Sequence, residues 1–206
     1  MKTSYLIRHG ETQANREGVF RGRGEVPLSA AWLQQAGELR AWFSNLKIER
    51  ILSSPLKRAA ETAAVCFPGR AIELQELVNN LDLGSWAGRK KKEIARQEPI
   101  LWGRWLEEPE KMSFPGGESL VAMKARTRHF SRLLANAGES CIAVVSHRSV
   151  LKALLAEVLG LKEKWFWKFH LDNASVTVLL HDAVRGFVLA KLNGTEHLSE
   201  YVFEWD

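Results

Sequence analysis

Short apolar runs alternate with longer segments of helical periodicity along most of this chain. A short apolar run that ends in charged or turn residues is typical of a strand, and a run without alternation is expected of a strand buried on both faces. The run at 141–145, Cys-Ile-Ala-Val-Val, is of the second kind and is the strongest strand signal in the chain. Strands are predicted at 5–7, 51–53, 72–74 and 141–145, and, as a hairpin joined by six residues, at 175–180 and 187–192.

Polar residues that favour helix starts precede the periodic segments. Ser29 and Ser119 are predicted N-caps, and Ser54, with Pro55 in the first turn, is a third. Gly138 falls just beyond the helix that Ser119 begins, which is where glycine commonly ends a helix. Helices are therefore predicted behind residue 29 as far as 43, and at 54–65, 119–136 and 149–159.

This order of elements predicts the fold class. Strands that alternate with helices form a mostly parallel central sheet with helices on both faces, a three-layer α/β/α sandwich, and the hairpin adds an antiparallel edge strand. The chain has no internal repeat and no Ser/Gly linker, so we expect a single domain over 1–206. The segment around 86–115, which is rich in Trp, Lys and Pro, is predicted to be a helical insertion, and 10–28 a long loop or broken helix.

The composition is that of an ordinary globular protein. Hydrophobic residues make up 46% of the 206 positions, which is enough for one well-buried core. No apolar run approaches the roughly 20 residues of a membrane span, so no membrane partner is expected. Cys66 and Cys141 stand among apolar neighbours and are predicted to be reduced core thiols. The lack of CxxC and HExxH patterns argues against a zinc site, and together these features predict a cytoplasmic protein.

The net charge of +5 fits an anionic ligand but is weak evidence by itself. The densest basic run, at 89–92, is expected to be a solvated helix start. A nucleic-acid patch would have aromatic residues or more arginines interleaved with the lysines. We therefore expect no nucleic-acid partner.

Three predicted strand-to-helix junctions carry the same kinds of polar residue. Arg8 and His9 follow the first strand, Arg58 lies in the helix after the second, and His147 and Arg148 follow the strand at 141–145. The carboxyl ends of parallel strands share one edge, where ligands bind and helix N-termini present free N–H groups. Each residue alone has a plainer interpretation, such as a structural histidine or a solvated arginine. Their coincidence at one edge predicts a pocket for a dianion such as phosphate.

The sequence resembles the histidine phosphatase superfamily, also called phosphoglycerate-mutase-like, over nearly its whole length. The resemblance implies the phosphoglycerate-mutase-like fold and phosphatase activity. It lies in an ordered series of motifs at characteristic spacings. The motifs are LIRHGET at 6–12 with Asn15, RG…PLS within 21–29, SSPLKRA at 53–59, ETA at 61–63, LGSWAG at 83–88, FPGGES at 114–119, VSH at 145–147 and DNAS at 172–175.

The resemblance implies that His9 is the nucleophile of a phosphohistidine mechanism. It also implies that Arg8, Arg58 and His147 bind the phosphoryl group and that Asn15 lies close to it. Neutral imidazole is nucleophilic near pH 7, and pocket cations can stabilise the equatorial oxygens, so we expect no metal and no other cofactor.

Two positions near the pocket differ from the usual family pattern. Arg21, beside Gly22, stands where Gln is common, and Arg148 follows His147 where Gly is usual. Arg21, Gly22 and Arg148 are predicted to help bind the substrate or its phosphate.

The proton donor for the leaving group is less well defined. Members of the family usually carry an acidic residue where this chain has Asn80, and a carboxamide cannot act as a general acid. Asp82 would share a face with Asn80 in an extended segment, so it is a predicted catalytic residue. Glu11, Glu25 and Glu118 are the alternatives. Because of Asn80, a catalytically weak or inactive member that only binds phosphate ligands is the alternative function.

The resemblance is to the small phosphatases of the family, the α-ribazole-phosphate phosphatases and the metal-independent phosphoserine phosphatases. It implies hydrolysis of small phosphomonoesters, with a small phosphorylated metabolite as partner, and leaves a homodimer open. The chain has eight tryptophans. They are expected in the core or on a dimer surface more than in the wall of a pocket, and the ones considered are Trp102, Trp105, Trp165 and Trp167.

Overall fold

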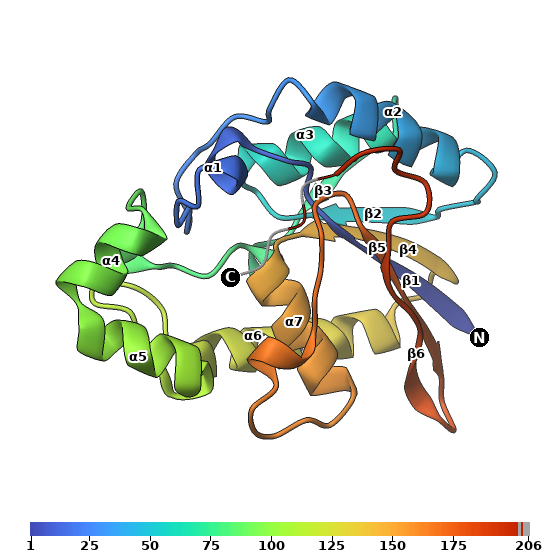
Figure 1. The fold of residues 1–206 in the computed structure, drawn as a ribbon. Helices are drawn as coiled ribbons and strands as arrows, with labels where there is room; N and C mark the ends of the chain where they lie inside the picture. The colour runs from blue at the N-terminus through green and yellow to red at the C-terminus, as the bar shows by residue number, and fades with distance from the viewer. Residues whose placement is uncertain (202, 204–206) are drawn as a thin grey trace.

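The structure is a computed structural model that describes residues 1–201 and 203 of the chain. In this described part, one six-stranded sheet has the order β3-β2-β4-β1-β5-β6 (Figure 1). The sheet follows the predicted mostly parallel pattern. β1 to β4 pair in parallel, and β5 runs antiparallel to both β1 and β6. The strands are β1 (Lys2–Arg8), β2 (Arg50–Ser53), β3 (Glu73–Leu74), β4 (Cys141–Ser146), β5 (Val176–Asp182) and β6 (Gly186–Gly194).

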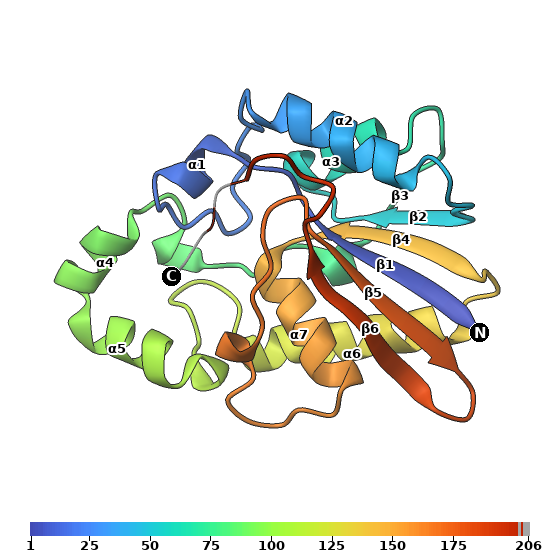
Figure 2. The ribbon, with the colours of Figure 1, turned by 45° about the vertical axis from the view of Figure 1, so that its right-hand side comes forward.

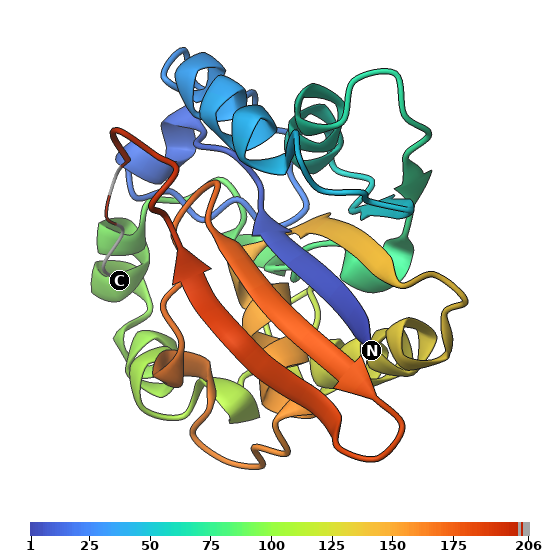
Figure 3. The same ribbon diagram turned by 90° about the vertical axis from the view of Figure 1, so that its right-hand side faces the viewer.

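Helices cover both faces of the sheet. In Figure 1, α2 and α3 lie above the sheet and α6 and α7 lie below it, while α4 and α5 stand to one side; the hairpin of β5 and β6 is nearest the viewer in Figure 3. The three-layer α/β/α prediction is therefore confirmed. The helices are α1 (Gln13–Arg16), α2 (Trp32–Phe43), α3 (Lys57–Cys66), α4 (Lys91–Gln97), α5 (Pro99–Glu107), α6 (Leu120–Asn136) and α7 (Arg148–Val158).

The two central strands divide their side chains between two cores. Leu6 and Val144 belong to the core under α6 and α7, whereas Ile7 and Val145 belong to the core under α2 and α3. Successive residues of a strand point to opposite faces, so an apolar run without alternation fills both cores at once. This is why 141–145 lacks the alternation of a half-exposed strand.

The segment 86–115 is largely helical, as predicted, and contains α4 and α5. Both helices lie beyond the carboxyl ends of β1 and β4 (Figure 2). Trp86, Ile94 and Trp105 are buried in the same core as α6 and α7, so the insertion is part of that core. No helix of residues 1–201 is long and apolar enough to cross a membrane.

Two of the three predicted N-caps are wrong. The helix predicted after Ser29 begins at Trp32, and the one predicted at Ser54 begins at Lys57. Both serine hydroxyls instead make tertiary contacts, Ser29 donating to the Glu11 carboxylate (2.7 Å) and Ser54 bonding to a histidine ring described below. Ser119 is a cap as predicted, because its Oγ accepts the N–H of Ala122 at 3.1 Å.

Two glycines hold the segment around Asn80 against the loop at 114–119. Gly84 has φ +49°, and a Cβ there would lie 2.1 Å from the carbonyl oxygen of Pro115. Gly117 faces it, and a Cβ on Gly117 would lie 2.5 Å from the carbonyl oxygen of Asp82. The backbones at Gly84 and Gly117 therefore approach so closely that neither position has room for a Cβ atom.

We expect Gly84→Ala to lower the free energy of unfolding by about 3 kcal/mol, since a backbone clash adds to the strain of a left-handed residue. Gly103→Ala is the matched control, because Gly103 lies inside α5 with nothing within 4 Å of its would-be Cβ. That variant should be stabilised by up to about 1 kcal/mol through helix propensity. Urea unfolding of both variants measures the difference, and equal stabilities would contradict the close approach.

Candidate active site

The three predicted junctions lie at one edge of the sheet. Arg8 ends β1, His9 follows it, and His147 follows β4, with the His9 N–H donating to the Ser146 carbonyl at 2.9 Å. The ring centroids of His9 and His147 are 5.1 Å apart. Residues 138 positions apart in the sequence thus share one buried site because β1 and β4 are paired neighbours.

The hydrogen bonds of His9 select its tautomer. Its Nδ1 lies 2.7 Å from the carbonyl oxygen of Gly10, which can only accept, so Nδ1 carries the hydrogen. In the neutral ring the lone pair is then on Nε2. The backbone around His9 is held as well, because the Asn173 amide donates to the His9 carbonyl (3.0 Å) and Gly10 N–H donates to Thr62 Oγ1 (3.0 Å). His9 is therefore oriented before any ligand binds.

Burial and positive charge keep both imidazoles neutral. Burial, followed by the charges of Arg58 and Arg8, holds the pKa of His9 well below its ordinary value. Burial and the charge of Arg58 do the same to the pKa of His147. A neutral ring with its lone pair on Nε2 is the nucleophilic form of histidine.

Backbone carbonyls hold the two arginines of the motifs. Arg8 is buried and donates through Nη1 to the carbonyl of Leu171 at 2.6 Å. Arg58, the second residue of α3, donates to the carbonyls of Gly24 (2.8 Å) and Gly22 (2.9 Å). Burial and the nearby charge of Arg21 lower the pKa of Arg58 to about 9, so the guanidinium still carries its charge at pH 7.

Ser54 positions His147. Its hydroxyl is 2.8 Å from His147 Nε2, and its oxygen also accepts the N–H of Leu56 at 3.3 Å. When the hydroxyl donates to Nε2, the hydrogen of the neutral ring lies on Nδ1. That Nδ1 is buried and has no hydrogen-bond partner within the described residues. It can therefore donate to an anion held between the two rings.

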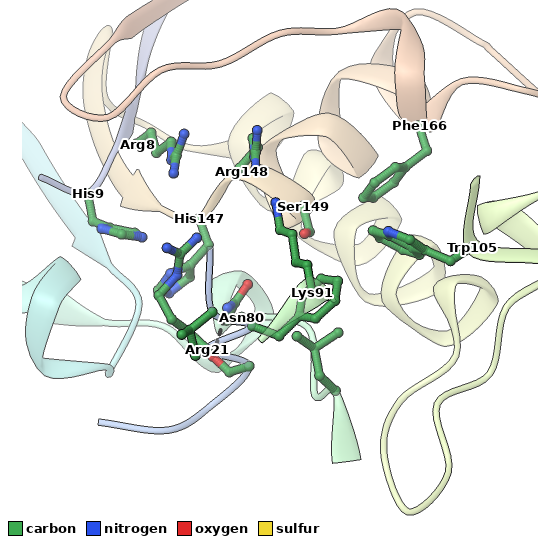
Figure 4. A pocket seen from close by; sticks show the side chains of 14 residues that line it. Arg8, His9, Arg21, Asn80, Lys91, Trp105, His147, Arg148, Ser149 and Phe166 are labelled. Atoms are coloured by element: carbon green, nitrogen blue, oxygen red, sulfur yellow. Dashed lines mark hydrogen bonds between the residues drawn. The ribbon is translucent and has the colours of Figure 1, made fainter. Parts of the chain in front are cut away.

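A cavity that is partly open to solvent lies beside these residues (Figure 4). Helix α7 begins at this cavity, so its first N–H groups and the positive end of its dipole favour an anion there. The residues lining the cavity are Arg8, His9, Val19, Phe20, Arg21, Gly22, Asn80, Leu83, Lys91, Trp105, His147, Arg148, Ser149 and Phe166.

The cavity includes residues that sequence reasoning did not find. Lys91, the first residue of α4, belongs to the basic run that was expected to be a solvated helix start. Ser149 and Phe166 also line it, and so does Trp105, one of the tryptophans that were expected mainly in the core or on a dimer surface. Trp105 belongs to the core as well, and Trp165 is buried there.

Other predicted site residues do not line the cavity. Arg58 lies outside the lining, although its charge acts on both histidines. The Asn15 side-chain oxygen accepts the N–H (2.9 Å) and hydroxyl (2.6 Å) of Thr12 and so caps α1. Its predicted closeness to the phosphate stays a prediction.

Asp82 does not face the cavity beside Asn80, in contrast to the prediction. Its carboxylate accepts the N–H of Gly84 at 3.0 Å, while the Asn80 side chain lines the cavity and donates to the Gly22 carbonyl at 2.8 Å. The Asp82 carboxylate therefore bonds to the first residue of the 3-10 turn Gly84–Trp86 and does not point with Asn80 into the cavity.

The alternative acids also lie elsewhere. Glu11 is fully buried and bonds to Arg16 and Ser29. Glu118 pairs with Arg126 at 2.7 Å, and Glu25 is exposed. Among the described residues, no carboxylate lines the cavity. Within residues 1–201 and 203, no group of three or more His, Cys, Asp or Glu side chains lies close enough together to hold a metal ion.

A family model described as "Histidine phosphatase superfamily (branch 1)" matches residues 4–195. The chain belongs to this superfamily. It is 34% identical over 202 residues to phosphoserine phosphatase 1 of Hydrogenobacter thermophilus, covering 97% of this chain and 95% of that protein. It is 30% identical to the adenosylcobalamin/alpha-ribazole phosphatase of Escherichia coli, covering 82% and 85%.

Solved structures of the histidine phosphatase superfamily have the same fold. Bacillus stearothermophilus YhfR superposes with a TM-score of 0.89 at 27% identity, covering 96% of this chain and 99% of that one. The resemblance to this superfamily and to its small phosphatases is therefore confirmed by the family model and by both relatives.

The buried histidines predict how stability depends on pH. A histidine whose pKa is lower in the folded than in the unfolded chain binds fewer protons when folded. The folded state is therefore destabilised relative to the unfolded state as the pH falls below about 6.5. We expect the free energy of unfolding to drop between pH 7 and pH 5 by up to about 2 kcal/mol for each buried imidazole. Chemical unfolding at several pH values measures this slope.

His147→Asn should flatten that slope, and His129→Asn, which changes an exposed residue of α6, should keep it. A wild-type slope that survives in His147→Asn would mean that His147 is not a neutral buried ring.

Proposed function

We propose that this protein hydrolyses small phosphomonoesters through a phosphohistidine formed on His9. The observation that carries the proposal is the state of His9, a neutral and oriented imidazole with its lone pair on Nε2 inside a cationic site. Its ring is 5.1 Å from that of His147, which leaves His147 able to contact a phosphoryl group attached to His9.

The proposed reaction has two steps. Nε2 of His9 attacks the phosphorus, the P–O bond to the alcohol breaks, and the leaving alkoxide takes up a proton from solvent water. Water then attacks the phosphorus of the phosphohistidine and releases inorganic phosphate, while His9 returns to its neutral form. Arg8, Arg58 and His147 stabilise the negative charge of the equatorial oxygens in both steps, so we propose that no metal is needed.

The relatives support a small phosphorylated metabolite as substrate. One is named for phosphoserine and the other for alpha-ribazole phosphate. We further propose that the protein acts in the cytoplasm and binds neither nucleic acid nor membrane, and a homodimer stays a prediction.

His9→Ala should lower the hydrolysis of p-nitrophenyl phosphate at least 1,000-fold between pH 5 and pH 8, because the covalent route is lost. Rapid quenching with a labelled ester should trap phosphate on the wild-type protein in an acid-labile, base-stable form, as expected of phosphohistidine. Equal activity of the two proteins would refute the proposed mechanism.

A wild-type protein that binds phosphate but releases no p-nitrophenol would support the alternative function, a member that only binds phosphate ligands. Asn80 is the observation behind that alternative. It lines the cavity at the position where the family pattern has an acidic residue.

Asn80→Glu should restore a proton donor for poor leaving groups. We expect kcat/KM for an alkyl ester such as glycerol 3-phosphate to rise about 10- to 100-fold, because a general acid protonates the leaving alkoxide. p-Nitrophenolate needs no such help, so hydrolysis of p-nitrophenyl phosphate should rise far less.

Asp82→Asn is the matched control, since Asp82 does not line the cavity. Asp82→Asn should change kcat/KM for the alkyl ester and for p-nitrophenyl phosphate by the same factor. A selective loss on the alkyl ester in Asp82→Asn would show that Asp82 reaches the leaving group after all.

A further inference from the structure

The loop at 170–174 contacts the two site residues at the end of β1. The Leu171 carbonyl accepts a hydrogen bond from Arg8 Nη1 at 2.6 Å, and the Asn173 amide donates to the His9 carbonyl at 3.0 Å. These contacts join residues that are 163 and 164 positions apart in the sequence. The direction in which Arg8 points therefore depends on how this distant loop is held.

Strand pairing does not hold the part of the loop that contacts Arg8. The pairing of β5 with β1 starts at Val176, and the 3-10 turn before the loop ends at Lys168. The Leu171 side chain is buried in the core under α6 and α7, but apolar packing is non-directional and does not fix where a backbone carbonyl points. That direction has to come from hydrogen bonds of the loop itself.

Asp172 and Asn193 form a reciprocal pair that ties the loop to the end of β6. The Asp172 N–H donates to Asn193 Oδ1 at 2.7 Å, and Asn193 Nδ2 donates to Asp172 Oδ2 at 2.9 Å. The other carboxylate oxygen, Oδ1, accepts from His170 Nε2 at 2.7 Å. Asp172 is buried, and a buried carboxylate is tolerated where hydrogen bonds of this kind satisfy it.

The bond from the Asp172 N–H acts directly on the contact with Arg8. The N–H of residue 172 and the carbonyl of residue 171 belong to one peptide group, which is planar and trans, so they point in opposite directions. Asn193 Oδ1 therefore binds one side of this group while Arg8 Nη1 binds the other. Fixing the N–H fixes the plane and hence the direction of the carbonyl. Hydrogen bonds in such a row also strengthen one another.

The backbone of β6 presents Asn193 to the loop. The pairing of β5 with β6 is irregular between Val176 and Val178, and an irregularity of this kind re-aims a side chain. Asn193 lies in the left-handed region at φ +50°, which asparagine adopts more readily than most residues. Its N–H donates to Thr177 Oγ1 at 3.1 Å. The break in regular pairing therefore lies where the pair with Asp172 forms.

We propose that Asn193 and Asp172 are positioning residues for phosphoryl binding. Together they fix the peptide group between residues 171 and 172, whose carbonyl directs the Arg8 guanidinium toward the phosphoryl group. Neither residue belongs to the described lining of the cavity, so both act through Arg8. The inference rests on the proposed role of Arg8 in binding the phosphoryl group, and it holds whether or not the ester is then hydrolysed.

Asn193→Gly removes the acceptor of the Asp172 N–H and introduces a residue that adopts the left-handed backbone without strain. We expect it to weaken the binding of inorganic phosphate about 10-fold, because charge-assisted hydrogen bonds from Arg8 depend on the direction of the guanidinium. Calorimetric titration with inorganic phosphate measures the Kd. The same variant should lower kcat/KM for p-nitrophenyl phosphate by about 10- to 100-fold.

Coupling to Arg8 separates positioning from a general loss of structure. Arg8→Met removes the guanidinium and keeps a long side chain in the buried position. In that background Asn193→Gly has no guanidinium left to misplace, so we expect it to change the phosphate Kd by less than about 2-fold. An effect of Asn193→Gly that is as large without the Arg8 guanidinium as with it would overturn the proposal.

An exchange of the two side chains provides a rescue. Asn193→Asp sets two carboxylates against each other and should weaken phosphate binding at least as much as Asn193→Gly does. Adding Asp172→Asn restores both hydrogen bonds with the amide and the carboxylate exchanged, and should return the Kd to within about threefold of the wild-type value. A double variant that regains wild-type stability in urea but not phosphate affinity would contradict the proposal.

Asp182→Ala is the matched control. The Asp182 carboxylate accepts the N–H groups of Val184 (2.9 Å) and Arg185 (2.8 Å) in the turn at the other end of the same hairpin. This variant also loses two hydrogen bonds of the hairpin, so it should lower the free energy of unfolding but leave the phosphate Kd unchanged. A loss of phosphate affinity equal to that of Asn193→Gly would mean that any weakening of the hairpin has this effect, and the positioning role would fail.

Phosphate binding and turnover test separate proposals. A wild-type protein that binds phosphate but hydrolyses no ester refutes the proposed phosphatase function, and the Kd values of the variants still decide the positioning of Arg8. An unchanged phosphate Kd in Asn193→Gly overturns the positioning role even if every variant remains an active phosphatase.

Discussion

The site depends on the parallel pairing of β1 with β4. Arg8 pairs with Ser146 in the register of these strands, and His9 and His147 are the next residues of each. Alternate residues of both strands fill two different cores, so a slip by one position would exchange every buried side chain between the faces. The same packing that stabilises the sheet therefore fixes the distance between the two imidazoles.

The site concentrates positive charge before any ligand is bound. Arg8 and Arg58 are buried, and the guanidinium of each is held by backbone carbonyls from loops. Burial, followed by the charge of Arg21, lowers the pKa of Arg58 to about 9, and the nearby charge of Glu25 opposes this shift. A dianion bound beside Arg58 and Arg21 would lower the electrostatic cost of holding these two like charges near each other.

Much of this arrangement could be predicted from the sequence. The β4 run and the Ser119 cap were clear because strong local patterns coincide there with tertiary packing. The N-caps predicted at Ser29 and Ser54 are wrong because these hydroxyls bond to residues far along the chain. No local pattern reveals such partners. The meeting of Arg8, His9 and His147 could be predicted because they end or directly follow two strands that pair in parallel.

Lys91 was missed for a different reason. It stands within four consecutive basic residues, and a uniform run carries no periodic signal of which member faces inward. Asp82 was predicted to face the cavity beside Asn80, but its carboxylate bonds to the N–H of Gly84, at the start of the turn that follows it. Both errors arise at the junction between the helical insertion and the sheet, where backbone direction is set by tertiary contacts.

The described lining of the cavity contains Asn80 and several cationic side chains but no carboxylate. A carboxyl group at position 80 could supply a proton to the leaving oxygen when protonated, but in its ionised form it would repel the phosphoryl dianion. Asn80 adds no charge to a lining that also contains Arg21, Lys91 and Arg148. Cationic side chains beside a leaving oxygen would stabilise the developing alkoxide and lower its need for a proton in the transition state. Asn80 is then consistent with the proposed hydrolysis if cationic side chains take over part of the role of a general acid.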